Sequence, residues 1–150
     1  MFGNSSSWVN YLFIFVVICL FLWPLSFFIY VSKWDNIDCY LPYRYFVSDM
    51  LHNGVLPFWN PYQQMGIPSY SETQNGMYSP IVWFLMLFGK YTSISLTIEL
   101  LIYYILAGVG MFKIISLFSK DTHVQFFGAF SFVFSGFMMG TSQIMIFIAG

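Results

Sequence analysis

Apolar residues fill two long regions of the chain, and a more polar, proline-rich segment separates these regions. The first region runs from residue 8 to residue 31 without a charged side chain. A helix of that length, at about 1.5 Å per residue, crosses the roughly 30 Å hydrocarbon core of a membrane. Pro24 lies inside it, and membrane helices accommodate proline with a kink. The pattern predicts a transmembrane helix over 8–32.

A cleaved signal peptide is the alternative interpretation of this N-terminal region. Signal peptides begin with basic residues, have a shorter apolar core and end in small residues at the cleavage site. Here the first seven residues contain no Lys or Arg, the apolar region is longer, and bulky residues fill its end. We therefore expect the region to be retained as a membrane helix.

Two further apolar regions predict spanning helices over 94–117 and 124–141. The second is rich in Gly, Ala and Ser, which allow close helix packing in lipid. The polar residues 119–123 between them predict a short turn. Another apolar stretch begins after Ser142 and continues to the last residue, so we expect this chain to be the front part of a longer polytopic protein.

The polar segment 33–93 predicts two short helices and otherwise turns. Residues 41–52 allow one helix, with Pro42 in its first turn. Residues 80–89 are strongly apolar, but a helix of this length covers only about 15 Å, half a membrane. We expect 80–89 to lie along the membrane interface, with Trp83 at headgroup level.

The side of the membrane that each segment faces follows from this interpretation of 80–89. If that helix does not cross, the N-terminus and the turn at 119–123 lie on one side, and 33–93 lies on the other. Lys113 and Lys120 flank the turn. The positive-inside rule then predicts a cytoplasmic N-terminus and an extracytoplasmic segment 33–93.

Composition supports a membrane protein and argues against several other classes. The chain is 59% hydrophobic and 7% charged, whereas a typical soluble domain is about 25% charged. Disorder needs low hydrophobicity and high charge. A net charge of −1 provides no general attraction to nucleic acid. We expect an all-α integral membrane protein: a polytopic helical bundle with a long external loop that carries short juxtamembrane helices.

Several motifs follow one another through the polar segment in a defined order. They are Trp34-Asp35-x-x-Asp38-x-Tyr40-x-Pro42-x-Arg44-Tyr45, Asn53-Gly54, Pro57-Phe58-Trp59-Asn60-Pro61-Tyr62, Gly66-x-Pro68, Gly76 and Tyr78-x-Pro80. In this order and spacing the chain resembles the YfhO-type bacterial membrane proteins, which look like members of the GT-C class of glycosyltransferases. Later matches are Gly108-x-Gly110-Met111-x-Lys113 and Ser135-Gly136-Phe137. The resemblance covers about 34–143, and it implies the N-terminal portion of a protein several times longer.

The resemblance implies an enzyme of the cell membrane. GT-C enzymes transfer a sugar from a polyprenyl-phosphate donor to an acceptor outside the cytoplasm, here a glycan or another cell-envelope acceptor. Their first external loop holds an acidic residue near the exit of the first helix. That acid maps best onto Asp35, and Asp38 is an additional acid. A carboxylate there can take the proton of the acceptor hydroxyl while the sugar leaves its phosphate.

The residues alone leave other roles open for the two acids. Either Asp35 or Asp38 can cap the helix that follows or simply face water. Two carboxylates at this spacing can also share a divalent cation through oxygen ligands. No other cofactor is expected.

Four more residues are candidates for substrate binding: Arg44, Trp59, Asn60 and Tyr62. Arg44 suits the phosphate of a lipid carrier, with a salt bridge to an aspartate as the alternative. Aromatic residues of the segment can stack on sugar faces, although interfacial aromatics are common without a ligand. The rigid run from Trp59 to Tyr62 is also a candidate structural clamp. Glu99, an acid inside an apolar region, is a functional candidate unless it reaches water.

A non-enzymatic polytopic protein, such as a transporter or flippase component, is the competing function. Transporters place polar groups at mid-membrane in broken helices, whereas the polar residues here gather in 33–93. A third possibility is that this part of the protein is inert without helices that follow it.

Overall fold

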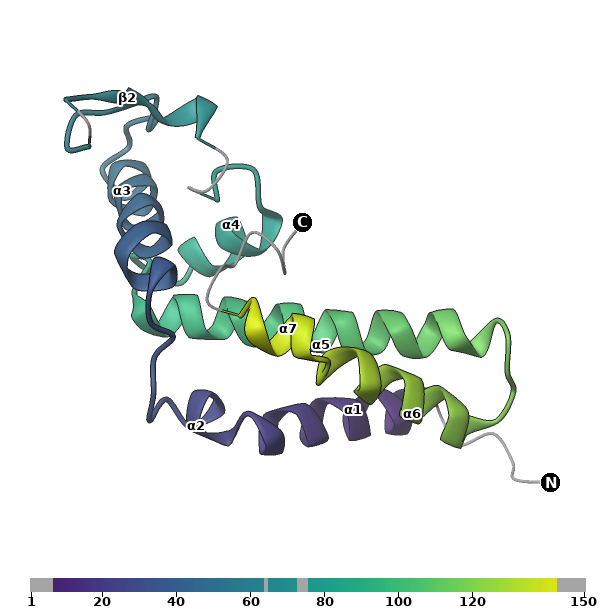
Figure 1. Cartoon of the computed structure of the whole chain (residues 1–150). Helices are drawn as coiled ribbons and strands as arrows, with labels where there is room; N and C mark the ends of the chain where they lie inside the picture. The colour runs from purple at the N-terminus through teal and green to yellow at the C-terminus, as the bar shows by residue number, and fades with distance from the viewer. Residues whose placement is uncertain (1–6, 64, 73–75, 143–150) are drawn as a thin grey trace.

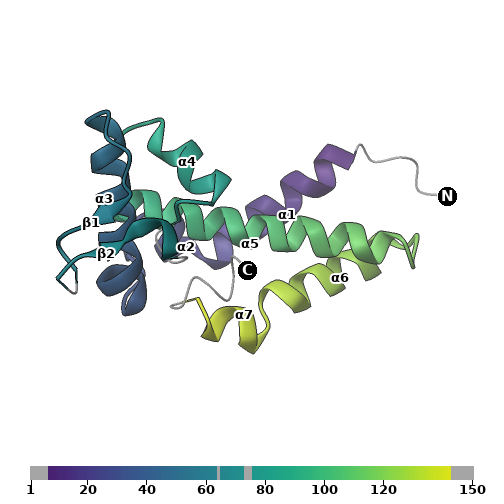
Figure 2. The same ribbon diagram turned by 90° about the horizontal axis from the view of Figure 1, so that it is seen from above.

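A long central helix organises the structure. The computed structural model describes residues 7–63, 65–72 and 76–142, and most of them are helical. The central helix is α5 (Ser93–Ser116), and α1 (Ser7–Phe21) and α6 (Thr122–Val133) pack against it. Both run antiparallel to α5 (Figure 1) and flank it when the molecule is viewed from above (Figure 2).

Aromatic side chains join α1 to α6 and close the three-helix arrangement. The rings of Phe13 and Phe126 lie 5.0 Å apart, and those of Phe21 and Phe134, the residue that follows α6, lie 4.0 Å apart. Beneath them, Ile14, Ile18 and Tyr104 are fully or almost fully buried. These contacts bury apolar surface from all three helices in a single core.

Gly108 permits the close approach of α1 and α5. A Cβ at this position would lie 3.0 Å from both Ile14 Cγ2 and Ile18 Cδ1 and 3.3 Å from Val133 Cγ2. Gly110, on the same helix, has no atom within 4 Å of the corresponding position.

We expect Gly108→Val to destabilise the fold by about 1–3 kcal/mol through overpacking, and Gly110→Val to leave stability nearly unchanged. The measurement is the unfolding temperature of each purified variant in the same detergent. Equal unfolding temperatures for the two variants would mean that α1 does not pack on α5 at Gly108.

The helical region expected over 8–32, with a kink at Pro24, is divided into two helices and ends at Ser26. α1 ends at Phe21, and a separate short helix, α2, spans Trp23–Ser26. The break occurs at Leu22, whose ψ of 32° lies outside the helical range. Pro24 has no N–H to continue the hydrogen-bond ladder of α1, so the chain restarts as a new helical turn.

The helix expected over 124–141 is also divided. α6 ends at Val133, and α7 (Gly136–Gly140) begins after Ser135, which has an extended backbone with ψ of 152°. The Ser135 hydroxyl accepts a hydrogen bond from the Met138 N–H at 3.3 Å, so a cap interrupts the apolar stretch. The apolar stretch after Ser142 lies outside the described residues.

Within the described residues, one helix is both long and apolar enough to cross a membrane. It is α5, with 24 residues, and its bounds differ by one residue at each end from the expected 94–117. The apolar helix α1 has 15 residues, which corresponds to only about 22 Å.

The described residues of 33–93 gather at the end where α5 begins (Figure 1). The segment contains a π-helix, η1 (Asn36–Tyr40), which leads directly into α3 (Leu41–His52). A two-stranded antiparallel hairpin, a 3-10 turn and a third helix follow it: β1 (Trp59–Asn60), β2 (Ile67–Pro68), η2 (Ser69–Ser71) and α4 (Pro80–Met86). The beginning of α1 and the turn between α5 and α6 lie at the opposite end (Figure 1).

Local sequence explains the limits of α3 and α4. Pro42 lies in the first turn of α3, directly after η1, and has no N–H to continue the hydrogen bonds of that π-helix. Gly54, with φ of +73°, ends this helix in the left-handed conformation that glycine adopts without strain. Ser79 caps α4 by accepting a hydrogen bond from the Val82 N–H.

Candidate functional site

A buried ion pair connects α3 to α5. Arg44 Nη1 lies 2.7 Å from Glu99 Oε2, and the two residues are 4% and 0% exposed. The Arg44 guanidinium also lies over the rings of Tyr40 and Tyr91, with its Cζ 5.5 and 5.8 Å from their centroids. The cation is therefore enclosed by one carboxylate and two aromatic faces.

Two tyrosine hydroxyls complete the surroundings of Glu99. Tyr91 donates a short hydrogen bond to Oε2, and Tyr103 donates one to Oε1 at 3.0 Å. Burial raises the pKa of the Tyr91 phenol and the charge of Glu99 raises it further, while Arg44 partly opposes this. The phenol thus keeps its proton and remains a donor at physiological pH.

The same cluster reaches the beginning of α4. Ser79 Oγ, which caps α4, lies 3.3 Å from the Tyr103 hydroxyl. On α3, the Ser48 hydroxyl accepts a hydrogen bond of 2.9 Å from the Tyr91 N–H. The position of Gly76, next to Arg44, admits no Cβ, which would lie 2.9 Å from Arg44 Nε. We call the group Arg44, Tyr91, Glu99 and Tyr103 the anchor cluster, because it ties α3 and α4 to α5.

The anchor cluster contains two residues that the sequence analysis named as candidates, Arg44 and Glu99. The sequence left two roles open for Arg44, phosphate binding and a salt bridge to an aspartate. In the structure Arg44 forms a salt bridge, but its partner is Glu99. Glu99 is not exposed to water at the helix end, since it has no accessible surface. Sequence reasoning singled out both residues without pairing them, and it missed Tyr91 and Tyr103.

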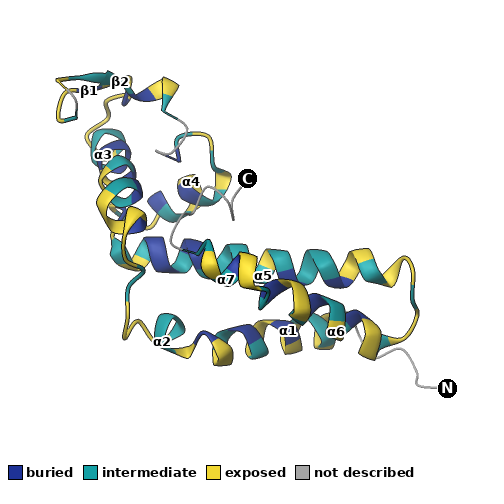
Figure 3. Cartoon of the chain, in the orientation of Figure 1, coloured by how far each residue is buried: buried dark blue, intermediate teal, exposed yellow. Residues whose placement is uncertain are grey.

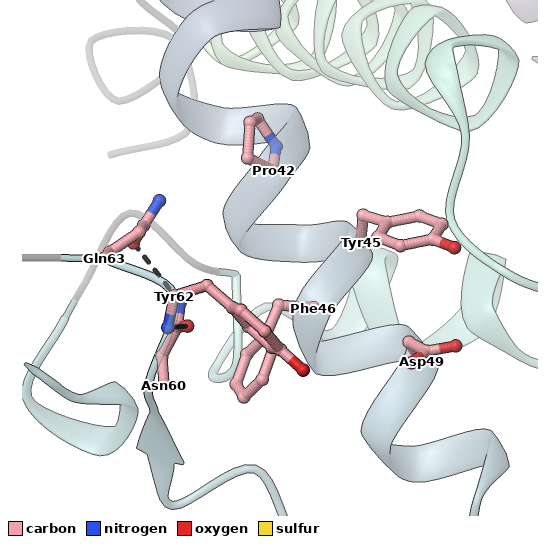
Figure 4. Close-up of a pocket in the computed structure, with 7 residues that line it drawn as sticks. All are labelled: Pro42, Tyr45, Phe46, Asp49, Asn60, Tyr62 and Gln63. Carbon is pink, nitrogen blue, oxygen red and sulfur yellow. Dashed lines mark hydrogen bonds between the residues drawn. The ribbon is translucent and has the colours of Figure 1, made fainter. Parts of the chain in front are cut away.

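A pocket of about 410 Å³ lies between α3 and the β1–β2 hairpin, outside the anchor cluster (Figure 4). Its lining is partly aromatic and partly polar, and consists of Pro42, Tyr45, Phe46, Asp49, Asn60, Tyr62 and Gln63. The four residues from α3 recur at intervals of three and four, the spacing that places side chains on one helix face. That spacing is the sequence signal that could have found Tyr45 and Asp49.

Asn60 determines how the hairpin side of the pocket is built. Asn60 is 2% exposed. Its side-chain oxygen accepts a hydrogen bond from the Tyr62 N–H at 3.0 Å, across Pro61, and its amide donates to Gln63 Oε1 at 3.3 Å (Figure 4). The resulting turn places the Tyr62 ring edge-to-face against Phe46, with centroids 6.1 Å apart.

Trp59 does not line the pocket. Its indole covers Gly66, where a Cβ would lie 2.6 Å from Trp59 Cζ2, and Gly66 has φ of +110°. Trp59 therefore packs across the hairpin. This contact fits the role of a structural clamp, one of the two roles that the sequence left open for the run from Trp59 to Tyr62. Of the four expected binding residues, the structure brings Asn60 and Tyr62 together in the pocket and places Arg44 and Trp59 elsewhere.

Asp35 and Asp38 are exposed at the beginning of η1, outside the pocket. Asp35, at the N-cap position, makes no side-chain cap to this helix. Trp34, just before them, has φ of +59°, a strained conformation of a kind often found at functional sites. Burial raises the pKa of the Cys39 thiol, and the charges of nearby carboxylates raise it further. These carboxylates belong to Asp35, Glu72 and Asp38, in order of decreasing effect, so the immediate surroundings of this thiol are electronegative.

Within the described ranges, no group of three or more His, Cys, Asp or Glu side chains is placed to hold a metal ion. A divalent cation shared by Asp35 and Asp38 would need its remaining ligands from substrate or water. Comparison with known proteins finds no family model, no curated protein and no solved structure that matches this chain.

Proposed function

We propose that this chain is the N-terminal part of a multi-pass membrane glycosyltransferase. In this proposal the enzyme transfers a sugar from a polyprenyl-phosphate donor to a glycan or cell-envelope acceptor outside the cytoplasm. Asp35 acts as the base for the acceptor hydroxyl. The proposal derives from the resemblance of residues 34–143 to YfhO-type proteins and from the arrangement of the polar segment.

One observation carries the proposal: the candidate acids and the pocket lie together at one end of the long helices. Asp35, Asp38, the pocket between α3 and the hairpin, and α4 all belong to the segment that gathers where α5 begins (Figure 1). An enzyme that takes a lipid-linked donor and a water-soluble acceptor needs its reacting groups at such a membrane–water boundary.

The exposed side chains of the long helices support a membrane location. Large apolar side chains are exposed along α1, α5 and α6 (Figure 3), including Trp8, Leu12, Phe15, Leu20, Leu106, Ile114 and Phe127. Soluble monomers rarely expose contiguous apolar surface on this scale. Lipid or further helices of the same protein would cover these side chains.

A transporter or flippase component, the competing function, would use polar groups halfway along its spanning helices. The buried acid Glu99 instead lies in the first two turns of α5, paired with Arg44 of α3. This pair holds the polar segment against the helix end, which favours an interfacial site over a path through the membrane.

Membrane topology provides a prediction that does not depend on activity. In a variant without native cysteines, we expect Tyr70→Cys and Thr92→Cys to react with a membrane-impermeant thiol reagent from the same, extracytoplasmic side. Ser119→Cys, in the turn between α5 and α6, should react only from the cytoplasmic side. Opposite sides for positions 70 and 92 would mean that 80–89 crosses the membrane.

The activity itself is tested in membranes that contain the protein of which this chain is part. Transfer of labelled sugar from a polyprenyl-phosphate donor to endogenous glycan is expected, and it should depend on this protein. If purified protein in lipid transfers no sugar from any of the common hexosyl donors, the proposed function is wrong.

A further inference from the structure

The pocket between α3 and the hairpin combines an aromatic wall with a polar rim and contains no cation. Tyr45, Phe46 and Tyr62 supply the aromatic surface, whereas Asp49, Asn60 and Gln63 supply hydrogen-bonding groups (Figure 4). The charge of Asp49 is balanced by Lys90, whose Nζ lies 2.6 Å from Asp49 Oδ1. A pocket of this kind is close to neutral and is poorly suited to phosphate, which proteins bind with cations or converging N–H donors.

The aromatic wall offers a flat face to a ligand. Tyr62 is 84% exposed although its ring is held against Phe46. The turn made by Asn60 and the rigid Pro61 fix its backbone. Because its backbone is held and its ring rests against Phe46, Tyr62 is partly preorganised, so a ligand that stacks on it loses less affinity to ordering of the side chain.

The polar rim suits a ligand with many hydroxyl groups. An ionised carboxylate has about four acceptor positions, and Asp49 uses one oxygen for Lys90, which leaves acceptor capacity for hydroxyl donors. Gln63 Oε1 accepts the hydrogen bond from Asn60, and the Gln63 amide NH₂ supplies donors for a ligand. A pocket volume of about 410 Å³ lies within the range of about 300–1,000 Å³ usual for small-molecule sites.

We propose that this pocket binds a neutral hexopyranose unit, with the apolar face of the sugar on Tyr62 and its hydroxyls on Asp49 and Gln63. Within the proposed function, on which this inference rests, the bound unit belongs to the acceptor glycan, because no cation lines the pocket and the nearby Lys90 is paired with Asp49. Arg44, the cation nearest in sequence, is buried in its pair with Glu99.

The test measures binding of neutral sugars to the chain reconstituted in lipid nanodiscs, by saturation-transfer NMR and calorimetry. The probes are oligosaccharides and methyl glycosides of glucose, galactose, mannose and N-acetylglucosamine, with inorganic phosphate as the charged competitor. We expect at least one neutral sugar to bind and phosphate not to displace it. Tyr62→Leu should weaken that binding by about tenfold or more.

Matched variants separate the pocket from general effects on the surface. Tyr70→Leu changes an exposed tyrosine outside the pocket and should bind like the wild type. Asp49→Asn should weaken binding, whereas Lys90→Met, which breaks the same ion pair from the other side, should weaken it less. The proposal is overturned if no neutral sugar binds, if Tyr62→Leu binds as the wild type does, or if phosphate competes.

Sugar transfer by the same variants distinguishes this proposal from the proposed function. If Tyr62→Leu raises the KM for acceptor and leaves kcat nearly unchanged, the acceptor assignment is supported. If transfer proceeds with an unchanged KM, the enzyme assignment stands and the pocket assignment is wrong. If sugar binds at Tyr62 but no transfer occurs, the pocket assignment stands and the enzyme assignment fails.

Discussion

Arg44→Met is expected to destabilise the protein by about 3–5 kcal/mol, because it leaves a buried acid without its cation. Glu99 has no accessible surface, and Arg44 Nη1 is the charged group that faces it, at 2.7 Å. The hydroxyls of Tyr91 and Tyr103 remain as donors, but they cannot balance the charge. Methionine retains most of the side-chain volume, so the loss reports the ion pair rather than a cavity.

The measurement is unfolding in detergent, followed by tryptophan fluorescence. The double variant Arg44→Met/Glu99→Gln should recover a large part of the loss, because neither charge is then buried alone. Lys90→Met breaks the ion pair with Asp49, which has an equally short N–O distance of 2.6 Å but is partly exposed to water, and it should have a much smaller effect. Equal losses in Arg44→Met and Lys90→Met would contradict the burial of the anchor cluster.

The long elements of the fold were predictable from local pattern, whereas the breaks inside them were not. α3 and α5 follow the expected ranges within a residue. The sequence indicates a kink at Pro24. Only the backbone conformation of Leu22 shows that α1 ends just before that residue. At Ser135 a hydroxyl competes for a backbone N–H, a local choice that average hydrophobicity does not register.

Contacts between distant residues explain what sequence reasoning missed at the site. Arg44 and Glu99 are 55 positions apart, and no periodicity relates residues at that separation. Asn60 and Tyr62 were identified because their turn is local and rich in proline. Tyr45 and Asp49 become pocket residues only because the hairpin folds back over α3, which depends on the path of the chain between them.

Asp35→Asn is expected to reduce sugar transfer by about 10²–10⁴-fold, the usual cost of losing a general base. This prediction rests on the proposed function. Asparagine preserves the shape of the side chain but cannot accept the proton of the acceptor hydroxyl at neutral pH. Asp35 is exposed and makes no cap to η1, so the substitution should leave the unfolding temperature unchanged. The measurement is transfer from a polyprenyl-phosphate sugar in membranes, with each variant at equal expression.

Asp38→Asn, three residues along the same helix, is the matched control. If Asp35 acts alone as the base, Asp38→Asn should reduce transfer far less. If the two carboxylates share a divalent cation, both variants should lose similar activity, and a chelator should reproduce that loss in the wild type. The cation would also offset the negative charge of Asp35, Glu72 and Asp38, which otherwise opposes a phosphate-bearing donor. Full activity in Asp35→Asn would assign the base to another residue of the protein.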